Sequence, residues 1–264
     1  MGNFGDLSSR AIETLSNATL IAAEDTRHSK RLLHAFEIDT PLMAYHDHSD
    51  DRALLRIEQC IETGGAVALI SDAGTPLISD PGYRLVRYVQ DRGHSVRPVP
   101  GACAAIAALS VAGLPTDRFM FEGFLPARQA ARRKRLEALR EASLTLVIYE
   151  APHRIQETLT DLHDILGSAR EALLAREMTK TFETLRRAPL AELVAFVGAD
   201  AHQRKGEFVL VVQGAAPVST EIDALTRAWL ERLVREMPAK RAAAVVADVT
   251  GMRKKLLYEY LIGK

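Results

Sequence analysis

Short apolar runs alternate with helix-like segments along the first half of the sequence, and this alternation restricts the fold more than any other feature. The runs lie at residues 18–23, 41–45, 66–70 and 95–99. Between them, apolar residues recur with helical spacing. Strands that alternate with such helices form crossover units, which place the strands parallel in a sheet covered on both faces. We therefore expect an α/β fold with a mainly parallel sheet.

A second α/β set is expected after residues 113–117, where Gly and Pro interrupt the pattern. Its predicted strands are residues 119–124, 144–149, 171–177 and 207–213, with a basic helix from Arg128 and another helix at residues 153–166. From Ser219 onward the pattern is purely helical, and Pro238 and Gly251 divide it into short helices that indicate a helix-turn-helix-like appendage. The predicted domains are residues 1–115, 116–215 and 219–264.

Composition excludes several classes of protein. The chain has 264 residues with 34 Lys and Arg against 34 Asp and Glu, so only local basic patches could bind nucleic acid. Cys60 and Cys103 lie in no CxxC motif, which argues against a disulfide framework or a cysteine zinc site and fits a reducing cytoplasm. No apolar window is long enough to span a bilayer, and residues 1–6 lack the features of a secretory leader.

The loop SDAGTPLISDPG, residues 71–82, directly follows the predicted strand at 66–70. Ligands of parallel sheets bind at the carboxyl ends of the strands, so Asp72 and Gly74 are candidate ligand contacts. The alternative is an ordinary strand–helix connection. We assign Asp80 and Pro81 to the start of the next helix, as N-cap and first helical residue.

The turn at residues 99–109 also follows a predicted strand and leads into a helix of small residues. Backbone N–H groups at such a helix start could hold a carboxylate, although an Ala-rich helix can equally serve tight packing. The sequence contains neither GxGxxG nor the P-loop motif, so it does not indicate binding of a nicotinamide dinucleotide or a P-loop NTPase function.

Three polar clusters follow predicted strands and are candidates for the substrate side of a site. They are residues 24–30, residues 46–51 and residues 176–183. A metal site from His46 and His48 is conceivable, but loops often carry solvated His and Asp, and we expect no metal. Each cluster could also be a solvated face.

Eight motifs in order resemble the tetrapyrrole methylase-like superfamily, in its branch that methylates ribosomal RNA. The motifs are GNFGDLSSRAIETL, LIAAEDTRHSKRLL, AYHDHSDD, LISDAGTPLISDPGYRLV, PVPGACAAIAALSVAGLPTDRFMFEGFLP, YEAPHRI, AREMTKTFET and KGEFVLVV. The resemblance implies two α/β domains with S-adenosylmethionine bound in the cleft between them, in a homodimer. It further implies 2′-O-methylation of a cytidine ribose in the decoding centre of 16S ribosomal RNA, in the small subunit.

The resemblance also implies the site residues. Cofactor contacts are expected from Asp72, Gly74, Thr75, Pro76, Cys103, Ala104, Tyr149 and Glu150. Glu24, Arg27, Glu177 and Lys180 are the predicted substrate-side residues. Removal of the 2′-hydroxyl proton needs a base, and we expect one acidic or lysine side chain among these four to accept it.

RNA contact needs cationic side chains to neutralise phosphates. The candidates on the helix after residue 127 are Arg128, Arg132, Arg133, Lys134 and Arg135, and those of the tail are Lys240, Arg241, Arg253, Lys254 and Lys255. Two solvated helical faces are the alternative interpretation.

Members of this superfamily begin with a strand that ends in Thr-Pro-Ile just before the Gly-Asn pair, whereas this sequence begins at Met1-Gly2. We therefore expect a first sheet without that strand and an incomplete floor to the cofactor pocket. Two other functions stay open: methylation of a corrin or porphyrin precursor, and a non-catalytic role in RNA binding or ribosome assembly.

Overall fold

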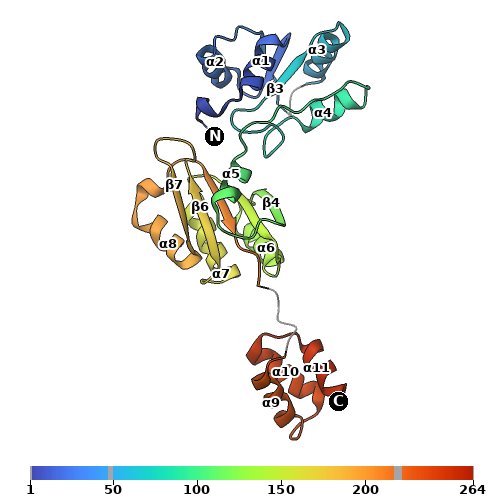
Figure 1. Cartoon of the computed structure of the whole chain (residues 1–264), viewed down its shortest axis with the longest axis vertical. Coiled ribbons are helices and arrows are strands. Elements are labelled where there is room, and N and C mark those ends of the chain that lie inside the picture. Colours follow the sequence, from blue (N-terminus) through green and yellow to red (C-terminus); the bar gives the residue numbers. More distant parts are fainter. Residues whose placement is uncertain (1, 47–49, 217–221, 264) are drawn as a thin grey trace. The chain divides into compact units, whose positions relative to one another are not determined.

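The computed structural model describes residues 2–46, 50–216 and 222–263. Its contacts divide the chain into two compact units, Met1–Gly214 and Ala215–Lys264. The first unit contains both β-sheets, and the second contains only helices (Figure 1).

The first sheet is parallel, in the order β2-β1-β3, as predicted. Helices α1 and α2 cover one face and α3 and α4 cover the other, each through a buried apolar cluster. The elements are α1 (Ser9–Asn17), β1 (Leu20–Ala23), α2 (Thr26–Ala35), β2 (Leu42–Ala44), α3 (Asp51–Glu62), β3 (Val67–Ile70) and α4 (Tyr83–Gln90), after a short 3-10 helix η1 (Phe4–Asp6).

Side-chain caps explain where the early helices begin. Ser8 accepts a hydrogen bond from the backbone N–H of Ala11 at the start of α1, and Asp25 caps α2 in the same way through Arg27 and His28. The cap of α3 is Asp50, one residue after the predicted Ser49, which lies outside the described residues.

The second sheet has the order β4-β5-β8-β6-β7, and only β4 and β5 are parallel. The prediction of a mainly parallel arrangement is wrong here, because β8 returns antiparallel between β5 and β6. Helix α5 packs on one face of this sheet and α6, α7 and α8 on the other. The elements are α5 (Ala104–Val111), β4 (Phe119–Phe124), α6 (Gln129–Leu139), β5 (Thr145–Glu150), α7 (Ile155–Leu166), β6 (Glu171–Arg176), β7 (Thr184–Pro189), α8 (Leu190–Ala199), the 3-10 helix η2 (Ala201–Arg204) and β8 (Phe208–Val212).

Two local predictions fail in the first half of the chain. Residues 95–99 form no strand and do not pair with β3, whose second edge is unpaired within the described residues; Val96 is 41% exposed. Helix α4 begins at Tyr83 rather than at Asp80-Pro81. Its N-cap is Gly82, whose φ of +133° only glycine adopts easily.

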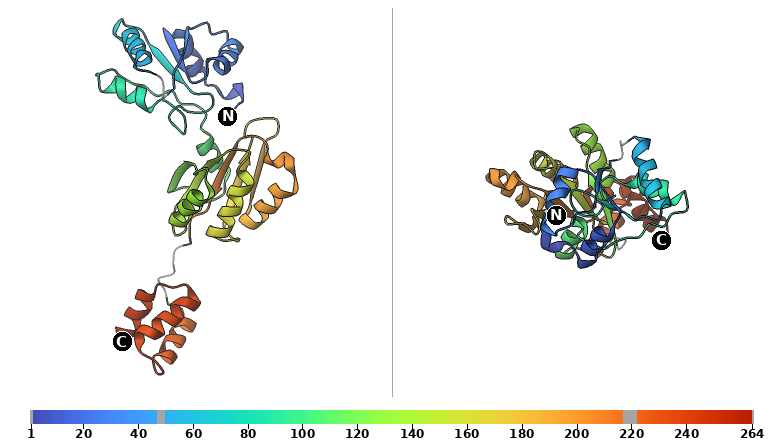
Figure 2. Two further views of the ribbon diagram at one scale, coloured as in Figure 1. Left: turned by 180° about the vertical axis from the view of Figure 1, so that it is seen from behind. Right: turned by 90° about the horizontal axis from the view of Figure 1, so that it is seen from above.

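The second unit is a three-helix bundle with its own core of Leu230, Val246 and Leu257. Figure 2 shows its helices (red) packed against one another: α9 (Ala224–Leu233), α10 (Ala239–Thr250) and α11 (Lys254–Ile262). A three-residue turn joins α10 to α11, and Gly251 ends α10 in the left-handed conformation. This is the predicted helix-turn-helix arrangement. No described helix is long and apolar enough to cross a membrane.

Candidate cofactor and substrate site

The carboxyl ends of β1 and β3 lie side by side, because the two strands pair in parallel register. Asp72 Oδ1 accepts a hydrogen bond from the Asp25 backbone N–H at 3.1 Å, and the Asp72 N–H donates to Glu24 Oε2 at 3.4 Å. Sheet pairing therefore brings together Glu24 and Asp72, which are 48 residues apart in the sequence.

The loop of residues 71–82 contacts the turn that precedes α5. Thr75 Oγ1 donates to the carbonyl oxygen of Ala102 at 3.1 Å. Gly74 has φ +78°, and a Cβ at this position would lie 3.7 Å from the same oxygen. The two candidate cofactor segments, 72–76 and 100–104, thus form one surface.

Beyond Pro76 the loop adopts backbone conformations that L-residues rarely occupy. Leu77 and Ser79 have φ values of 73° and 64°. A Cβ on Gly82 would lie 2.8 Å from the Leu69 side chain, so the loop packs closely on β3. Such strained backbone persists only where the surrounding structure holds it, and it is common at functional sites.

Asp80 does not cap a helix, in contrast to the prediction. Its half-buried carboxyl group receives a hydrogen bond from Ser71 and lies near Glu24 and Asp72. Burial, followed by the negative charge of Glu24, raises the pKa of Asp80 to about 6. This carboxyl group therefore titrates close to neutral pH.

The start of α5 is joined to the second sheet by Tyr149. The Ala105 N–H donates to the Tyr149 hydroxyl at 3.0 Å, and burial and the nearby Cys103 thiol raise the tyrosine pKa to about 12. Cys103, the N-cap residue, provides no side-chain acceptor for the first turn. Backbone donors there, next to half-buried Ala104, are available to an anionic group.

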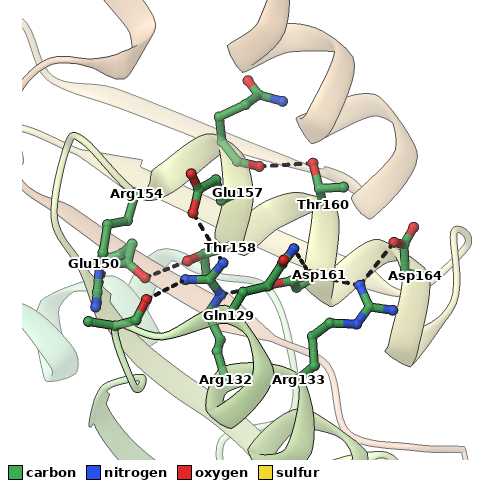
Figure 3. Close-up of polar contacts among 12 residues, drawn as sticks. Gln129, Arg132, Arg133, Glu150, Arg154, Glu157, Thr158, Thr160, Asp161 and Asp164 are labelled. Carbon is green, nitrogen blue, oxygen red and sulfur yellow. Dashed lines mark hydrogen bonds and ion pairs between the residues drawn. The ribbon is translucent and has the colours of Figure 1, made fainter.

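Tyr149 packs against the cluster that contains α5, and Glu150, the next residue of β5, points to the opposite face of the sheet. Figure 3 shows Glu150 beside Arg154 and Thr158. The buried carboxylate accepts hydrogen bonds from Arg154 at 2.6 Å, Thr158 at 2.6 Å and the Ala151 N–H at 2.7 Å. Its predicted cofactor contact does not fit this placement, because both oxygens are already engaged in the protein interior.

Glu177 and Lys180 are brought together, but they bind each other. Lys180 Nζ donates to Glu177 Oε1 and to Glu207 Oε2, both at 2.9 Å. Against the opposing effect of burial, a hydrogen bond from the Glu207 backbone N–H and the contact with Lys180 lower the pKa of Glu177, and the contacts with Glu207 and Glu177 raise the pKa of Lys180. Each is therefore held in its charged form and is a poor proton acceptor at neutral pH.

The other predicted polar residues of the first domain lie at the surface. Arg27 is 91% exposed and forms an ion pair with Asp25. His46 is exposed, whereas Asp47 and His48 lie outside the described residues. Within the described ranges, no three His, Cys, Asp or Glu side chains are grouped as metal ligands.

The basic residues of α6 are largely neutralised within the protein (Figure 3). Arg132 is fully buried and donates to Asp161 at 2.7 Å, so its predicted phosphate contact is incompatible with the structure. Arg133 contacts Asp161 and Asp164, and Arg135 forms a two-point ion pair with Glu122 at 2.8 Å. Arg128 and Lys134 are exposed and form no ion pair with any described residue.

The predicted basic residues of the second unit are all exposed. They are Lys240, Arg241, Arg253, Lys254 and Lys255. Lys255 lies 3.8 Å from Glu259, a weak surface contact. Arg253 and Lys254 stand at the start of α11, the second helix of the helix-turn-helix.

Residues 1–194 match the family described as Tetrapyrrole (Corrin/Porphyrin) Methylases, and residues 220–263 match the RsmI C-terminal HTH domain. The chain is 54% identical to Ribosomal RNA small subunit methyltransferase I of Pseudomonas aeruginosa, over 98% of this chain and 93% of the relative. It is 47% identical to the protein of that name from Escherichia coli O157:H7, over 99% of this chain and 92% of the relative. The chain belongs to the tetrapyrrole methylase family.

Solved structures share the family's fold at low sequence identity. A diphthine synthase matches with a TM-score of 0.61 at 15% identity, over 80% of this chain and 86% of the other. A uroporphyrin-III C-methyltransferase complexed with S-adenosylhomocysteine matches with a TM-score of 0.51 at 18% identity. The match covers 78% of this chain and 91% of the other. The predicted fold class is confirmed.

Sequence reasoning missed Asp80 as a candidate functional side chain, and it named Arg176 only as a member of the polar cluster at residues 176–183. Asp80 was assigned to a helix cap, since Asp-Pro is a common helix start. The available signal was the following Gly82, which can begin a helix in its own right. Arg176 ends a buried strand, and only the tertiary structure reveals its surroundings.

Proposed function

We propose that this chain transfers a methyl group from S-adenosylmethionine to the 2′-hydroxyl of a cytidine in the 16S RNA of the small ribosomal subunit. The observation that carries the proposal is the full-length similarity to proteins named Ribosomal RNA small subunit methyltransferase I, which includes the C-terminal helical unit. The joined surface of residues 72–76 and 100–104 supports it.

The residues of that surface fit the cofactor. Backbone N–H groups at the start of α5 would hold its carboxylate, and the small side chains of Cys103 and Ala104 leave room for an aromatic ring. The cofactor supplies an electrophilic methyl group on a sulfonium sulfur. The chain's own task is to orient the ribose and to accept the hydroxyl proton.

Asp80 is the side chain best suited to accept that proton. Its pKa of about 6 makes it largely ionised at pH 7 yet still basic, whereas Glu177 is held anionic by Lys180. The strained segment around Leu77 and Ser79 fixes its position. Burial and the negative charge of nearby Glu24 keep the pKa of Asp80 high.

The enzyme acts as a homodimer in the cytoplasm. Edge strand β4 and helix α5 expose Phe124, Ile106 and Val111, which are half accessible, and a second copy could cover these apolar side chains. Light scattering after size-exclusion chromatography tests the dimer.

Incorporation of label is the decisive test of the function. Small subunits from a strain without this activity are incubated with the protein and methyl-labelled S-adenosylmethionine, and the 2′-O-methyl position is mapped in 16S RNA. Label in a single cytidine supports the proposal. Label in a corrin or porphyrin precursor, or cofactor binding without transfer, supports the rival functions.

A further inference from the structure

Two adjacent hollows lie at one end of the second sheet, on the face opposite α5. The first, of about 400 Å³, is lined by Arg176, Glu177, Phe182, His202, Gln203, Lys205 and Gly206. The second, of about 850 Å³, is lined by residues of the loop after β5 and shares Lys205 and Gly206 with the first. Arg204 also lines it.

Arg176 is a buried cation that forms no ion pair within the described residues, although its charge lowers the pKa of nearby Glu177 and Asp200. Its side chain is 8% exposed, yet Nε donates to the Lys205 carbonyl at 2.6 Å, and Nη1 donates to the Phe182 carbonyl at 3.0 Å and to Thr184 Oγ1 at 3.2 Å. All three acceptors are neutral. Nη2 makes no hydrogen bond within the described part of the chain and keeps some accessible surface.

The carboxylates near these hollows are engaged by other cations or by backbone donors. Glu177 binds Lys180, and Glu157 binds Arg132. Asp200 caps η2 through the His202 N–H at 2.8 Å. Arg204 and Lys205 form no ion pair with any described residue. The two hollows therefore present three cations, Arg176, Arg204 and Lys205, that form no ion pair with a described residue.

Burial of a cation that forms no direct ion pair is costly, and an anionic ligand in contact with the guanidinium would offset part of that cost. A guanidinium with a free amino group suits a phosphate oxygen, and neighbouring lysine and arginine side chains suit a chain of phosphates. Because the lining of the two hollows is continuous through Lys205 and Gly206, it fits an extended phosphodiester backbone better than one small anion.

This surface is separate from the candidate cofactor surface. Strand alternation directs Tyr149 and Ala175 toward α5, whereas Arg176 pairs in register with Phe208 of the opposite core. We propose that Arg176, Arg204 and Lys205 form the site that binds the phosphate backbone of the substrate RNA. This inference rests on the proposed function, because it assumes an RNA substrate.

The test compares the Arg204→Ala/Lys205→Ala double variant with Arg118→Ala. Arg118 is exposed at the start of β4, at the opposite end of the same sheet. Arg176 is left unchanged because its hydrogen bonds hold two loops. We measure the affinity of each protein for fluorescently labelled 16S RNA as a function of salt, together with S-adenosylmethionine affinity and Tm.

The double variant should bind RNA roughly tenfold more weakly at about 0.1 M salt. Its plot of log K, the logarithm of the association constant, against log salt concentration should be less steep by about 1 to 2. Arg118→Ala should bind like the wild type, and both variants should keep the wild-type Tm and cofactor affinity. Unchanged RNA affinity and an unchanged salt slope in the double variant would contradict the proposed phosphate-binding site. Weakened cofactor binding with normal RNA binding would also contradict it.

A footprint of the unmodified protein gives a second readout. The 16S RNA should protect Lys205 from acetylation by an amine-reactive reagent, read by mass spectrometry, whereas protection of Lys134 alone would place the RNA on α6 and overturn the proposal. If the wild-type protein methylates small subunits but fails these tests, only the site is wrong. If it transfers no methyl group to RNA at all, the proposed function itself fails.

Discussion

At the scale of single residues, the environment of a carboxyl group decides its chemistry. Glu150 and Asp80 are both partly or fully withdrawn from water. The carboxyl oxygens of Glu150 accept hydrogen bonds from Arg154 and Thr158. Burial and the negative charges of Glu24 and Asp72 raise the pKa of Asp80, and its hydrogen bond from Ser71 offsets part of this effect.

We expect Asp80→Asn to abolish most methyl transfer while leaving the fold intact. If Asp80 is the base, kcat of the wild type rises with pH through about 6, and the variant loses roughly 100-fold or more at pH 7. Single-turnover transfer measured between pH 5 and 8 checks both. A variant with the wild-type rate and pH profile would exclude Asp80 as the base.

The same residue should leave a signature in stability. Its pKa is higher in the folded state than the ordinary value of 3.8, so the unfolding free energy falls as pH rises from about 4 to 6. Relative to the wild type, Asp80→Asn should therefore gain roughly 1 kcal/mol at pH 7, a value reduced for solvent screening, and nothing at pH 4. Urea denaturation at the two pH values measures the difference.

At the scale of elements, α6 has a structural role that its basic sequence does not reveal. Arg132 joins α6 to α7 through Asp161, and this ion pair is shielded from water. The exposed Lys134 on the same helix makes no such contact.

We expect Arg132→Gln to lower the unfolding free energy by about 3 kcal/mol, the low end for a broken buried ion pair, because Arg133 still binds the buried Asp161. Lys134→Gln is the matched control and should change the unfolding free energy by less than about 0.5 kcal/mol. Chemical denaturation of both variants measures this. Equal stabilities would contradict the structural role of Arg132.

The turn of the helix-turn-helix depends on Gly251. Its φ is +70°, and a Cβ there would meet no neighbouring atom, so only backbone strain opposes a side chain. Gly251→Ala should therefore destabilise the second unit by roughly 1 kcal/mol. The change should be visible as a lower melting transition of that unit in calorimetry, with the transition of the first unit unchanged.

At the scale of the whole molecule, charge is divided unequally between the two units. Residues 215–264 contain nine Lys and Arg against six Asp and Glu, although the complete chain is neutral. The second unit has its own apolar core. It is therefore suited to add phosphate contacts to those made by the first unit.

A chain that ends at Gly214 should keep the Tm of the first unit and its affinity for S-adenosylmethionine, because the candidate cofactor residues all precede that point. It should bind 16S RNA more weakly and with a smaller salt dependence. Isothermal titration with the cofactor and fluorescence titration with RNA check the two statements. Unchanged RNA affinity would show that the second unit does not contact RNA.

The sequence by itself determined the parallel first sheet, the helical second unit and the two loops that meet at Thr75 and Ala102, but it predicted a strand at residues 95–99 that does not form and missed β7 and α8. The correct predictions follow from apolar periodicity and from Gly and Pro at turns, which act locally. Only the tertiary structure decided the antiparallel insertion of β8 and the burial of Arg132. It alone raised the pKa of Asp80 and buried Arg176 without an ion pair among the described residues, because burial and charge proximity depend on residues distant in the sequence.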